Sequence, residues 1–186
     1  DARGLRRLRA QFKQQAKRLN IPSVSIGEMV AFATSRTLPQ HPELNSHMQE
    51  QSIVHYRDVH LGIAVDTDRG LLVPTIRDAG ERSLVSLATE GRRLAEAARE
   101  ASISADELAD ATFTVTNLGA SGVHSFTPII NPPQVAILGV GSIRPEPRFV
   151  EDDPGSASGE DQEVEYVPAI GLSLTVDHRA VDGAPA

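Results

Sequence analysis

Helical and strand-like periodicities occur together in this chain, in an irregular order, and this mixture restricts its fold more than any other feature. Apolar residues recur at helical spacing from Leu5 to Leu19, and capping-box residues Ser25 and Glu28 precede a second helical stretch. Large apolar residues alternate with small or polar ones from Ile170 to Val176, as in a strand with one buried face. Because long connections separate these segments, we predict an α/β sandwich rather than a tandem βαβ array.

The expected elements follow from these periodicities and from capping and turn residues. Helices are expected at residues 4–19, 26–38 and 83–100, with a short fourth helix opening at Ser104. Strands are expected at residues 52–57, 60–66, 71–76, 112–116, 135–140 and 170–176. The acidic, Gly- and Ser-containing segment 151–163 is expected to be a mobile hairpin tip. We predict one domain over residues 1–186, flanked by further segments of a longer protein.

Composition excludes several classes of function. The chain has no cysteine, which removes disulfides and a thiol nucleophile and is compatible with a cytoplasmic setting. Its formal net charge is -7 at pH 7, so we expect no nucleic-acid partner, although residues 3–18 are locally basic. No stretch is long and apolar enough to suggest a membrane partner. The histidines at positions 41, 47, 55, 60 and 124 lack metal-ligand spacing, so no metal site is expected.

The strongest candidates for catalytic residues follow the last expected strand. His178 leaves this strand, and Asp182 comes four positions later. A neutral imidazole at a strand end can act as a base near pH 7, while a nearby carboxylate can orient it or hold the loop. The alternative is a charged loop that merely closes the strand.

A second candidate is Thr116, at the end of the strand expected at residues 112–116. Its hydroxyl could donate a hydrogen bond to a developing oxyanion. The alternative is the ordinary β-propensity of threonine before a turn. Two further enzyme classes are poorly supported. Gly139 and Gly141 lack the third glycine of a dinucleotide fingerprint, and no Gly-x-Ser-x-Gly occurs.

Five stretches, taken together, resemble the catalytic domain of the dihydrolipoamide acyltransferase (E2) family of 2-oxo acid dehydrogenase complexes. They span His41–Asn45, Leu61–Thr67 with Gly70–Pro74, Phe113–Gly119, Ile130–Gly141 and Asp177–Gly183. The resemblance implies the fold of chloramphenicol acetyltransferase, a two-layer sandwich in which helices flank a mixed sheet. It also implies a homotrimer with active sites between subunits. The family's first strand and C-terminal helix have no counterpart in residues 1–186.

The resemblance also implies residue roles. His178 would be the general base for the thiol of coenzyme A or dihydrolipoamide, and Thr116 would stabilise the oxyanion. Asp182, where the family has Asp or Asn, would have a positional role, whereas Asp177 and Arg179 would be structural. Coenzyme A would be a substrate, and the lipoyl group would be carried on a separate domain absent from this chain. The implied coenzyme A contacts are Arg9, Ser25, Asp66, Asn117, Gly141 and Ile143.

The implied partners are copies of the same chain, in trimers that assemble into a core of 24 or 60 subunits, and a lipoyl domain with E1 and E3 components reached through flanking regions. Acetyl or branched-chain acyl groups are favoured over succinyl. Two alternatives stay open: a structural core subunit without activity, and a small-molecule acetyltransferase. The second usually has His-His where this chain has Asp177-His178.

Overall fold

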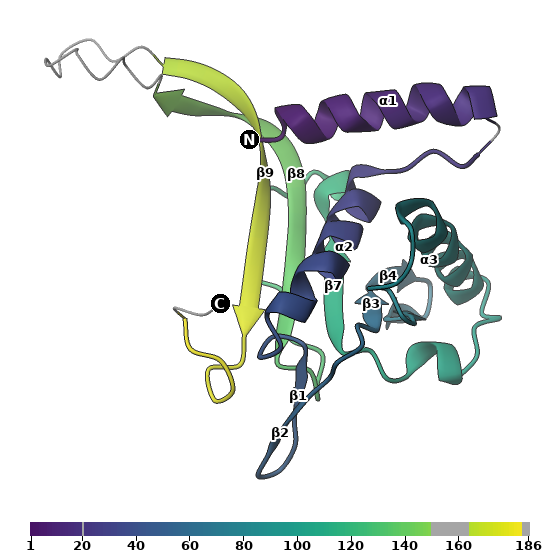
Figure 1. Ribbon diagram of the computed structural model, residues 1–186, viewed down its shortest axis with the longest axis vertical. Coiled ribbons are helices and arrows are strands. Elements are labelled where there is room, and N and C mark those ends of the chain that lie inside the picture. Colours follow the sequence, from purple (N-terminus) through teal and green to yellow (C-terminus); the bar gives the residue numbers. More distant parts are fainter. Residues whose placement is uncertain (20, 150–163, 184–186) are drawn as a thin grey trace, which may run out of the picture.

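A five-stranded mixed sheet forms the centre of the molecule. The computed structural model describes residues 1–19, 21–149 and 164–183 (Figure 1). The strand order is β6-β3-β7-β8-β9, in which β3, β7 and β8 are parallel and the edge strands β6 and β9 are antiparallel to their neighbours. The bounds are β3 Leu61–Ile63, β6 Thr75–Ile76, β7 Phe113–Asn117, β8 Ala136–Phe149 and β9 Val164–Val176. The predicted mixed sheet is therefore confirmed.

Three of the four predicted helices are present as α-helices: α1 Arg3–Leu19, α2 Ile26–Thr37 and α3 Leu84–Arg99. The Ser25 side chain accepts a hydrogen bond from the Glu28 amide, and the Glu28 carboxylate accepts one from the Ser25 amide, which confirms the capping box. α2 and α3 cover one face of the sheet, where Leu87 and Val115 belong to one buried cluster (Figure 1). None of the described helices is long and apolar enough to cross a membrane.

Several predicted elements are broken up in the structure. The strand predicted at 60–66 divides into β3 and β4 (Val65–Thr67), and the one at 71–76 divides into β5 (Gly70–Leu72) and β6. β4 and β5 form a separate hairpin. β2 (Ile53–His55) is shorter than predicted and pairs with the unpredicted β1 (Ser46–Met48). The short fourth helix is a 3-10 turn, Asp106–Leu108. The prediction of one continuous strand over residues 71–76 was wrong because Pro74, which has no amide hydrogen, separates β5 from β6.

The β8–β9 hairpin is much longer than predicted. The sequence indicated only residues 135–140 and 170–176, whereas the two strands pair out to Phe149 and Val164. Pro145 lies opposite Pro168 in this outer half, and proline residues break the periodicity that a strand prediction depends on. The outer half extends beyond the body of the molecule (Figure 1). The predicted mobile tip, residues 151–163, lies outside the described residues.

The loop between β7 and β8 crosses the sheet at a bulge in β8. The register shifts between Val140 and Ile143, and the Ser142 amide bonds to the Val123 carbonyl at 2.7 Å instead of to β9. A Cβ atom at Gly141 would overlap the carbonyl oxygen of His124, and so would one at Gly171. Glycine is therefore required at both positions for the loop to lie this close to the sheet.

Candidate functional site

One pocket brings together five of the six predicted coenzyme A contacts. It has a volume of about 430 Å³ and lies where α1, the start of α2 and the end of β7 meet the bulge of β8. The five residues are Arg9, Ser25, Asn117, Gly141 and Ile143. They come from three elements, α1, β7 and β8, and from the residue that caps α2. We call this space the nucleotide-side pocket, after the predicted coenzyme A contacts that line it; Arg9 is the one charged residue among its lining residues.

Asp66 is the predicted contact that does not line this pocket. It lies on β4, where its Cα pairs with that of Leu71, and its side chain is exposed. The β4–β5 hairpin therefore carries Asp66 on a surface separate from the nucleotide-side pocket.

Thr116 lines a different pocket of about 450 Å³, which we call the Thr116 pocket. Because side chains alternate along a strand, Thr114 and Thr116 point to one face of the sheet and Val115 and Asn117 to the other. The Thr114 hydroxyl bonds to the Gln134 side chain at 2.7 Å. The half-buried Thr116 hydroxyl has no hydrogen-bond partner among the described residues and can donate to a bound molecule.

The walls of the Thr116 pocket are apolar. They come from β5 and β8, from Ala64 between β3 and β4, and from the loop that follows β7, including Leu71, Phe126, Ile129 and Ile137. A Cβ atom at Gly139 would lie 2.9 Å from the Phe126 ring, so this ring occupies the space above Gly139. Leu71 and Ile129 are 67% and 88% exposed, which leaves the rim of the pocket uncovered in a single chain.

His178 and Asp182 lie in a tight loop after β9. The His178 Nδ1 atom is 3.6 Å from Asp182 Oδ1, and the two side chains are 76% and 80% exposed. The amides of Ala180 and Val181 both bond to the Asp177 carbonyl, at 2.9 and 3.0 Å, while the side chain of Val181 is buried. The loop thus has a fixed backbone while the imidazole remains accessible to a reactant.

Asp177 and Arg179 hold this loop through their side chains, as the sequence predicted. The Arg179 guanidinium donates hydrogen bonds to both Asp177 oxygens, the shortest at 2.6 Å. These bonds, with one from the Arg179 amide, lower the pKa of Asp177 to about 2. Asp177 therefore stays ionised and paired at neutral pH, and His178 lies between two residues that are locked together.

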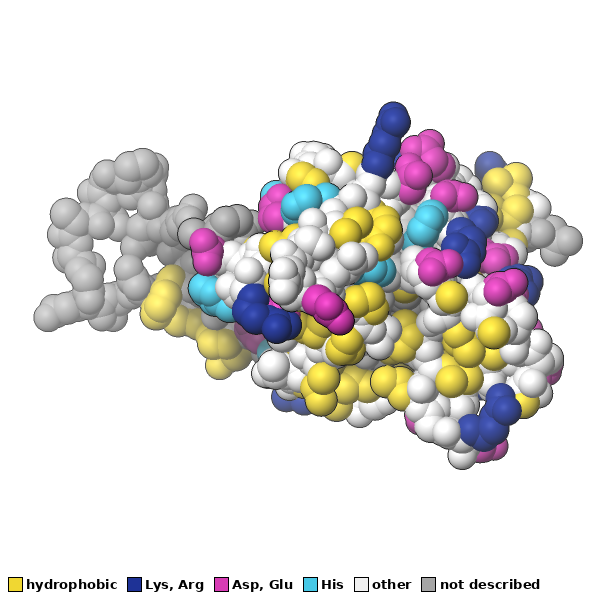
Figure 2. Space-filling view, turned by 90° about the horizontal axis from the view of Figure 1, so that it is seen from below, with side chains coloured by type: hydrophobic (Ala, Val, Ile, Leu, Met, Phe, Trp, Pro, Cys, Tyr) yellow, Lys and Arg dark blue, Asp and Glu magenta, His cyan; other side chains and the backbone are white. Residues whose placement is uncertain are grey.

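Thr116 and His178 of one chain are far apart. Gly139 pairs with Thr116 on one side and with Ser173 on the other. The Asp177 amide donates a hydrogen bond to the Val135 carbonyl, so the pairing with β8 continues to Asp177, four residues beyond Ser173. Asp177 is therefore separated from Thr116 by roughly 13 Å along the strands and by two strand spacings, roughly 10 Å, across the sheet. His178 follows at the end facing away from α1, where Figure 2 shows exposed histidine and acidic side chains. The two groups cannot act on one atom within a single chain.

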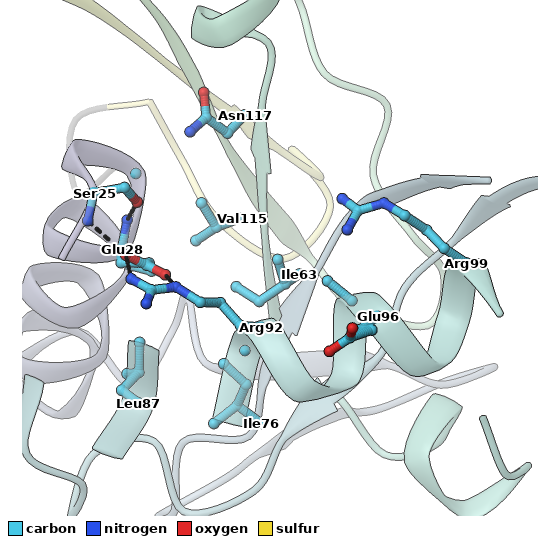
Figure 3. Close-up of a pocket in the computed structure, with 14 residues that line it drawn as sticks. Ser25, Glu28, Ile63, Ile76, Leu87, Arg92, Glu96, Arg99, Val115 and Asn117 are labelled. Carbon is cyan, nitrogen blue, oxygen red and sulfur yellow. Dashed lines mark hydrogen bonds and ion pairs between the residues drawn. The ribbon is translucent and has the colours of Figure 1, made fainter. Parts of the chain in front are cut away.

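A third pocket, of about 420 Å³, lies between α2, α3 and the sheet (Figure 3). At its mouth Arg92 clamps Glu28, with Nε 2.6 Å from Oε1 and a second nitrogen 2.8 Å from Oε2. Burial raises the pKa of Glu28, but the hydrogen bonds from Arg92 and Ser25 outweigh it and hold that pKa below its usual value. Sequence reasoning found the cap but missed Arg92, because no local pattern links residues that are 64 positions apart.

The described residues contain no group of three or more side chains that could hold a metal ion. His47, the most buried of the predicted non-ligand histidines, bonds to the Ala111 carbonyl at 2.9 Å and to the Tyr56 hydroxyl at 2.9 Å. Both of its ring nitrogens are therefore engaged in the fold.

Comparison with known proteins identifies the family of the chain. Residues 1–186 match the family described as 2-oxoacid dehydrogenases acyltransferase (catalytic domain). The chain is 40% identical over 186 residues to the dihydrolipoyllysine-residue acetyltransferase component of the acetoin cleaving system of Bacillus subtilis. That match covers 100% of this chain and 44% of the relative, so the chain spans less than half of that relative's length.

Solved structures support the same assignment. The dihydrolipoamide acetyltransferase of Azotobacter vinelandii, studied for the catalytic roles of a serine, a histidine and an asparagine, superposes with a TM-score of 0.87 at 36% identity. A cubic core of the pyruvate dehydrogenase multienzyme complex gives the same values. Both matches cover 100% of this chain and 72% of the other. A chloramphenicol acetyltransferase, at 14% identity and a TM-score of 0.51 over 93% of this chain and 76% of the other, shows the predicted fold.

Proposed function

This chain belongs to the 2-oxoacid dehydrogenase acyltransferase family, and from that premise we propose that it transfers an acyl group between a dihydrolipoyl thiol and coenzyme A. The observation that carries the proposal is that this member of the family has both an accessible imidazole, His178, and a hydroxyl without a hydrogen-bond partner among the described residues, Thr116. Coenzyme A and the lipoyl group, which a separate domain would carry, act as substrates.

The chemistry needs one base and one oxyanion donor. His178 removes the proton from the attacking thiol, and the thiolate adds to the carbonyl carbon of the acyl thioester. The Thr116 hydroxyl donates a hydrogen bond to the resulting oxyanion. When the tetrahedral intermediate collapses, the carbon–sulfur bond of the original thioester breaks, and the leaving thiolate takes the proton back from the His178 imidazolium. No covalent acyl-enzyme forms.

The reacting atoms lie between two copies of the chain in this proposal. Since one chain holds His178 and Thr116 at opposite ends of the sheet, the base comes from one copy and the hydroxyl from the next. A ring of three copies satisfies this arrangement for every chain, and the uncovered apolar rim of the Thr116 pocket supports a neighbour there. The histidine and serine studied in the Azotobacter acetyltransferase match these two groups in chemistry.

Asp182 has a positional role in the proposal. Its carboxylate lies 3.6 Å from His178 Nδ1, and both groups are exposed. The Azotobacter acetyltransferase has an asparagine among its three studied residues, and an amide cannot relay a proton as a carboxylate does. Asp182 therefore orients the imidazole so that its other nitrogen faces the thiol.

Coenzyme A occupies the nucleotide-side pocket, with Arg9 at its charged end and Asn117 next to Thr116 along β7. Asp66, on the β4–β5 hairpin, contacts coenzyme A outside this pocket. Assembly into a larger core, and binding to E1 and E3 components and to a lipoyl domain, is proposed through other parts of the whole protein. The cubic core of the similar pyruvate dehydrogenase complex supports this extension.

The acyl group is acetyl in this proposal. The Phe126 ring fills the space above Gly139 in the Thr116 pocket, which leaves less room for a branched chain. Replacing Phe126 with alanine should raise the ratio of kcat/KM for isobutyryl-coenzyme A to that for acetyl-coenzyme A by roughly tenfold. A variant with an unchanged ratio would show that other walls select the acyl group.

The experiment that tests the function measures acyl exchange between acetyl-coenzyme A and free dihydrolipoamide. The wild-type oligomer should catalyse it, and His178→Ala should abolish it while leaving circular dichroism and coenzyme A binding intact. Full activity of His178→Ala would refute the mechanism. Coenzyme A binding without exchange in the wild type would favour a structural core subunit. Transfer to a drug hydroxyl without transfer to dihydrolipoamide would favour a small-molecule acetyltransferase.

A further inference from the structure

The side chain of His124 attaches the β7–β8 loop to β8 at the point where the loop crosses the sheet. Its Nδ1 atom lies 3.2 Å from the Ser142 carbonyl oxygen, and its Nε2 atom lies 2.5 Å from Glu146 Oε1. The Ser142 amide also donates a hydrogen bond to the Val123 carbonyl at 2.7 Å. The loop is therefore held at the crossing by one backbone contact and by the ring of His124. We call His124 and Glu146 the crossing pair.

Both ring nitrogens of His124 face hydrogen-bond acceptors. A carbonyl oxygen can only accept a hydrogen bond, and so can an ionised carboxylate, so each contact needs an N–H group on the ring. A neutral imidazole has one N–H group and satisfies one contact, whereas the imidazolium has two and satisfies both. A charge-assisted hydrogen bond is short, as the contact with Glu146 is. With Glu146 ionised, the crossing pair is complete only when both nitrogens of His124 carry a proton.

The charged surroundings of the crossing pair come from the two strands of the hairpin. On β9 the ring lies near Gly171, which has no side chain. The Arg144 guanidinium donates a hydrogen bond to the Gly122 carbonyl at 2.9 Å. Among the described residues, Glu146 is the only carboxylate that forms an ion pair with His124. The other charged residues on the Glu146 face of the hairpin are Arg144 and Arg148 of β8 and Glu165 of β9, which is paired with Arg148 in the strand register.

The crossing pair lies just before the ring that occupies the Thr116 pocket. Phe126 follows His124 by two residues, which span at most about 7 Å of chain, so a displacement of His124 is passed on to Phe126. The Phe126 ring packs directly on the backbone of β8, since a Cβ atom at Gly139 would lie 2.9 Å from it. A fixed His124 therefore keeps this ring over Gly139.

We propose that His124 and Glu146 are positioning residues that select the acyl group: the crossing pair holds Phe126 in the Thr116 pocket and so favours acetyl over larger acyl groups. The inference rests on the proposed function and deepens it. Because the pair needs a doubly protonated ring, the selection weakens as the pH rises and His124 becomes neutral. Before the crossing, Gly119 and Ala120 line the nucleotide-side pocket, so release of the pair also weakens the binding of coenzyme A.

The test measures kcat/KM for isobutyryl-coenzyme A and for acetyl-coenzyme A with free dihydrolipoamide, and takes the ratio of the two. This ratio cancels the titration of His178, because the same base serves both donors. His124→Ala and Glu146→Ala each remove the crossing pair from one side, whereas Glu146→Gln keeps an amide that can accept from the ring or donate to it. His41→Ala is the matched control, since its Nδ1 atom lies 3.4 Å from Glu43 Oε1 and the two residues line neither pocket.

At about pH 6, where a histidine is mostly protonated, the ratio should rise roughly threefold to fivefold in His124→Ala and in Glu146→Ala. The double variant should match the single ones, because both remove the same interaction. The Kd of coenzyme A should rise roughly twofold to threefold in these variants but not in Phe126→Ala, which leaves the crossing intact. His41→Ala should match the wild type.

The pH profile gives an independent readout on the intact protein. The wild-type ratio should rise between about pH 6 and pH 9 towards that of His124→Ala, whose own ratio should stay constant. Glu146→Gln should keep the low-pH ratio of the wild type over the whole range, because an amide can pair with the charged or the neutral ring.

A wild-type ratio in both His124→Ala and Glu146→Ala, with unchanged oligomer size and circular dichroism, would overturn the role of the crossing pair, while a raised ratio in Phe126→Ala would still uphold selection by that ring. An equal rise in His41→Ala would overturn it too. If the variants failed to assemble, a wild-type ratio that is constant from about pH 6 to pH 9 would overturn it. A wild-type protein that catalyses no exchange with either donor would overturn the proposed function as well.

Discussion

Thr116 near one end of β7 and His178 beyond the end of β9 face different ends of one sheet, so in the proposed mechanism each chain carries half of two active sites. The separation follows from the pairing of Thr116 with Gly139 and of Gly139 with Ser173. No rotation of the two side chains can close a gap of this size. The oligomer is thus part of the proposed mechanism and not only of the assembly.

Mixing two inactive variants should restore activity. Thr116→Ala should lower kcat by roughly 10²- to 10³-fold because an oxyanion donor is lost. His178→Ala should be inactive. When the two variants are co-expressed or refolded together in equal amounts, about a quarter of the sites combine an intact histidine with an intact threonine. Exchange assays should recover about that fraction, and a mixture no more active than its components would place both groups in one chain.

Replacing Asp182 with asparagine should preserve most of the activity. An amide can still accept a hydrogen bond from the imidazole, so kcat should fall by less than roughly tenfold, whereas Asp182→Ala should lose more. The pH profile of kcat/KM for the two variants shows whether Asp182 only orients the imidazole or also carries charge. If Asp182→Asn were as inactive as His178→Ala, the carboxylate would have to carry charge or a proton in the transition state.

The Asp177–Arg179 pair should make stability depend on pH in the acid range. The pKa of Asp177 is lowered from 3.8 to about 2, so its contribution is complete above about pH 4 to 5 and is lost as the pH falls towards 2. Asp177→Asn should therefore be less stable than the wild type by about 0.5 to 1 kcal/mol at pH 7, because Arg179 is largely exposed.

Urea unfolding at a series of pH values measures this difference. The two stability curves should converge near pH 2. A gap that persisted at this pH would show that Asp177 acts through its shape rather than its charge.

Glu28 should contribute more to stability than an average exposed carboxylate. Glu28→Ala removes half of the capping box and leaves Arg92 without its partner, so the free energy of unfolding should fall by about 1 to 3 kcal/mol. Glu96 is a matched control, since it lines the same pocket but forms no ion pair with any residue of the described ranges. Glu96→Ala should change stability by less than about 0.5 kcal/mol. Similar effects of the two substitutions would contradict a structural role for the clamp.

Local patterns were enough to predict much of the fold. The capping residues Ser25 and Ser83 mark the starts of α2 and α3 correctly, because a cap acts over three residues and can be recognised in sequence. The outer half of β8 was missed because Pro145 and Pro147 interrupt its pattern. These prolines are tolerated in the outer part of a long hairpin, a tertiary circumstance that the sequence alone does not reveal.

The candidate site was predictable to the extent that its residues fall in recognisable blocks. His178 and Thr116 were predicted in this way, but their separation depends on the strand order, which no single block contains. The unpaired hydroxyl of Thr116 could not be predicted either, since the neighbouring Thr114 is the same residue type and is bonded to Gln134. The partner of Glu28 was missed because Arg92 lies on another helix, and no local pattern in the sequence links the two residues.

The loop that crosses β8 at Gly141 couples two compartments that lie on different faces of the sheet. Before the crossing, Gly119 and Ala120 line the nucleotide-side pocket, and after it Phe126 and Ile129 line the Thr116 pocket. The crossing itself is fixed by the contact of the His124 carbonyl with two glycines. A shift of this one segment would therefore reshape both compartments at the same time, so in the proposed function the sites for the thiol carrier and for the acyl group could not be altered independently.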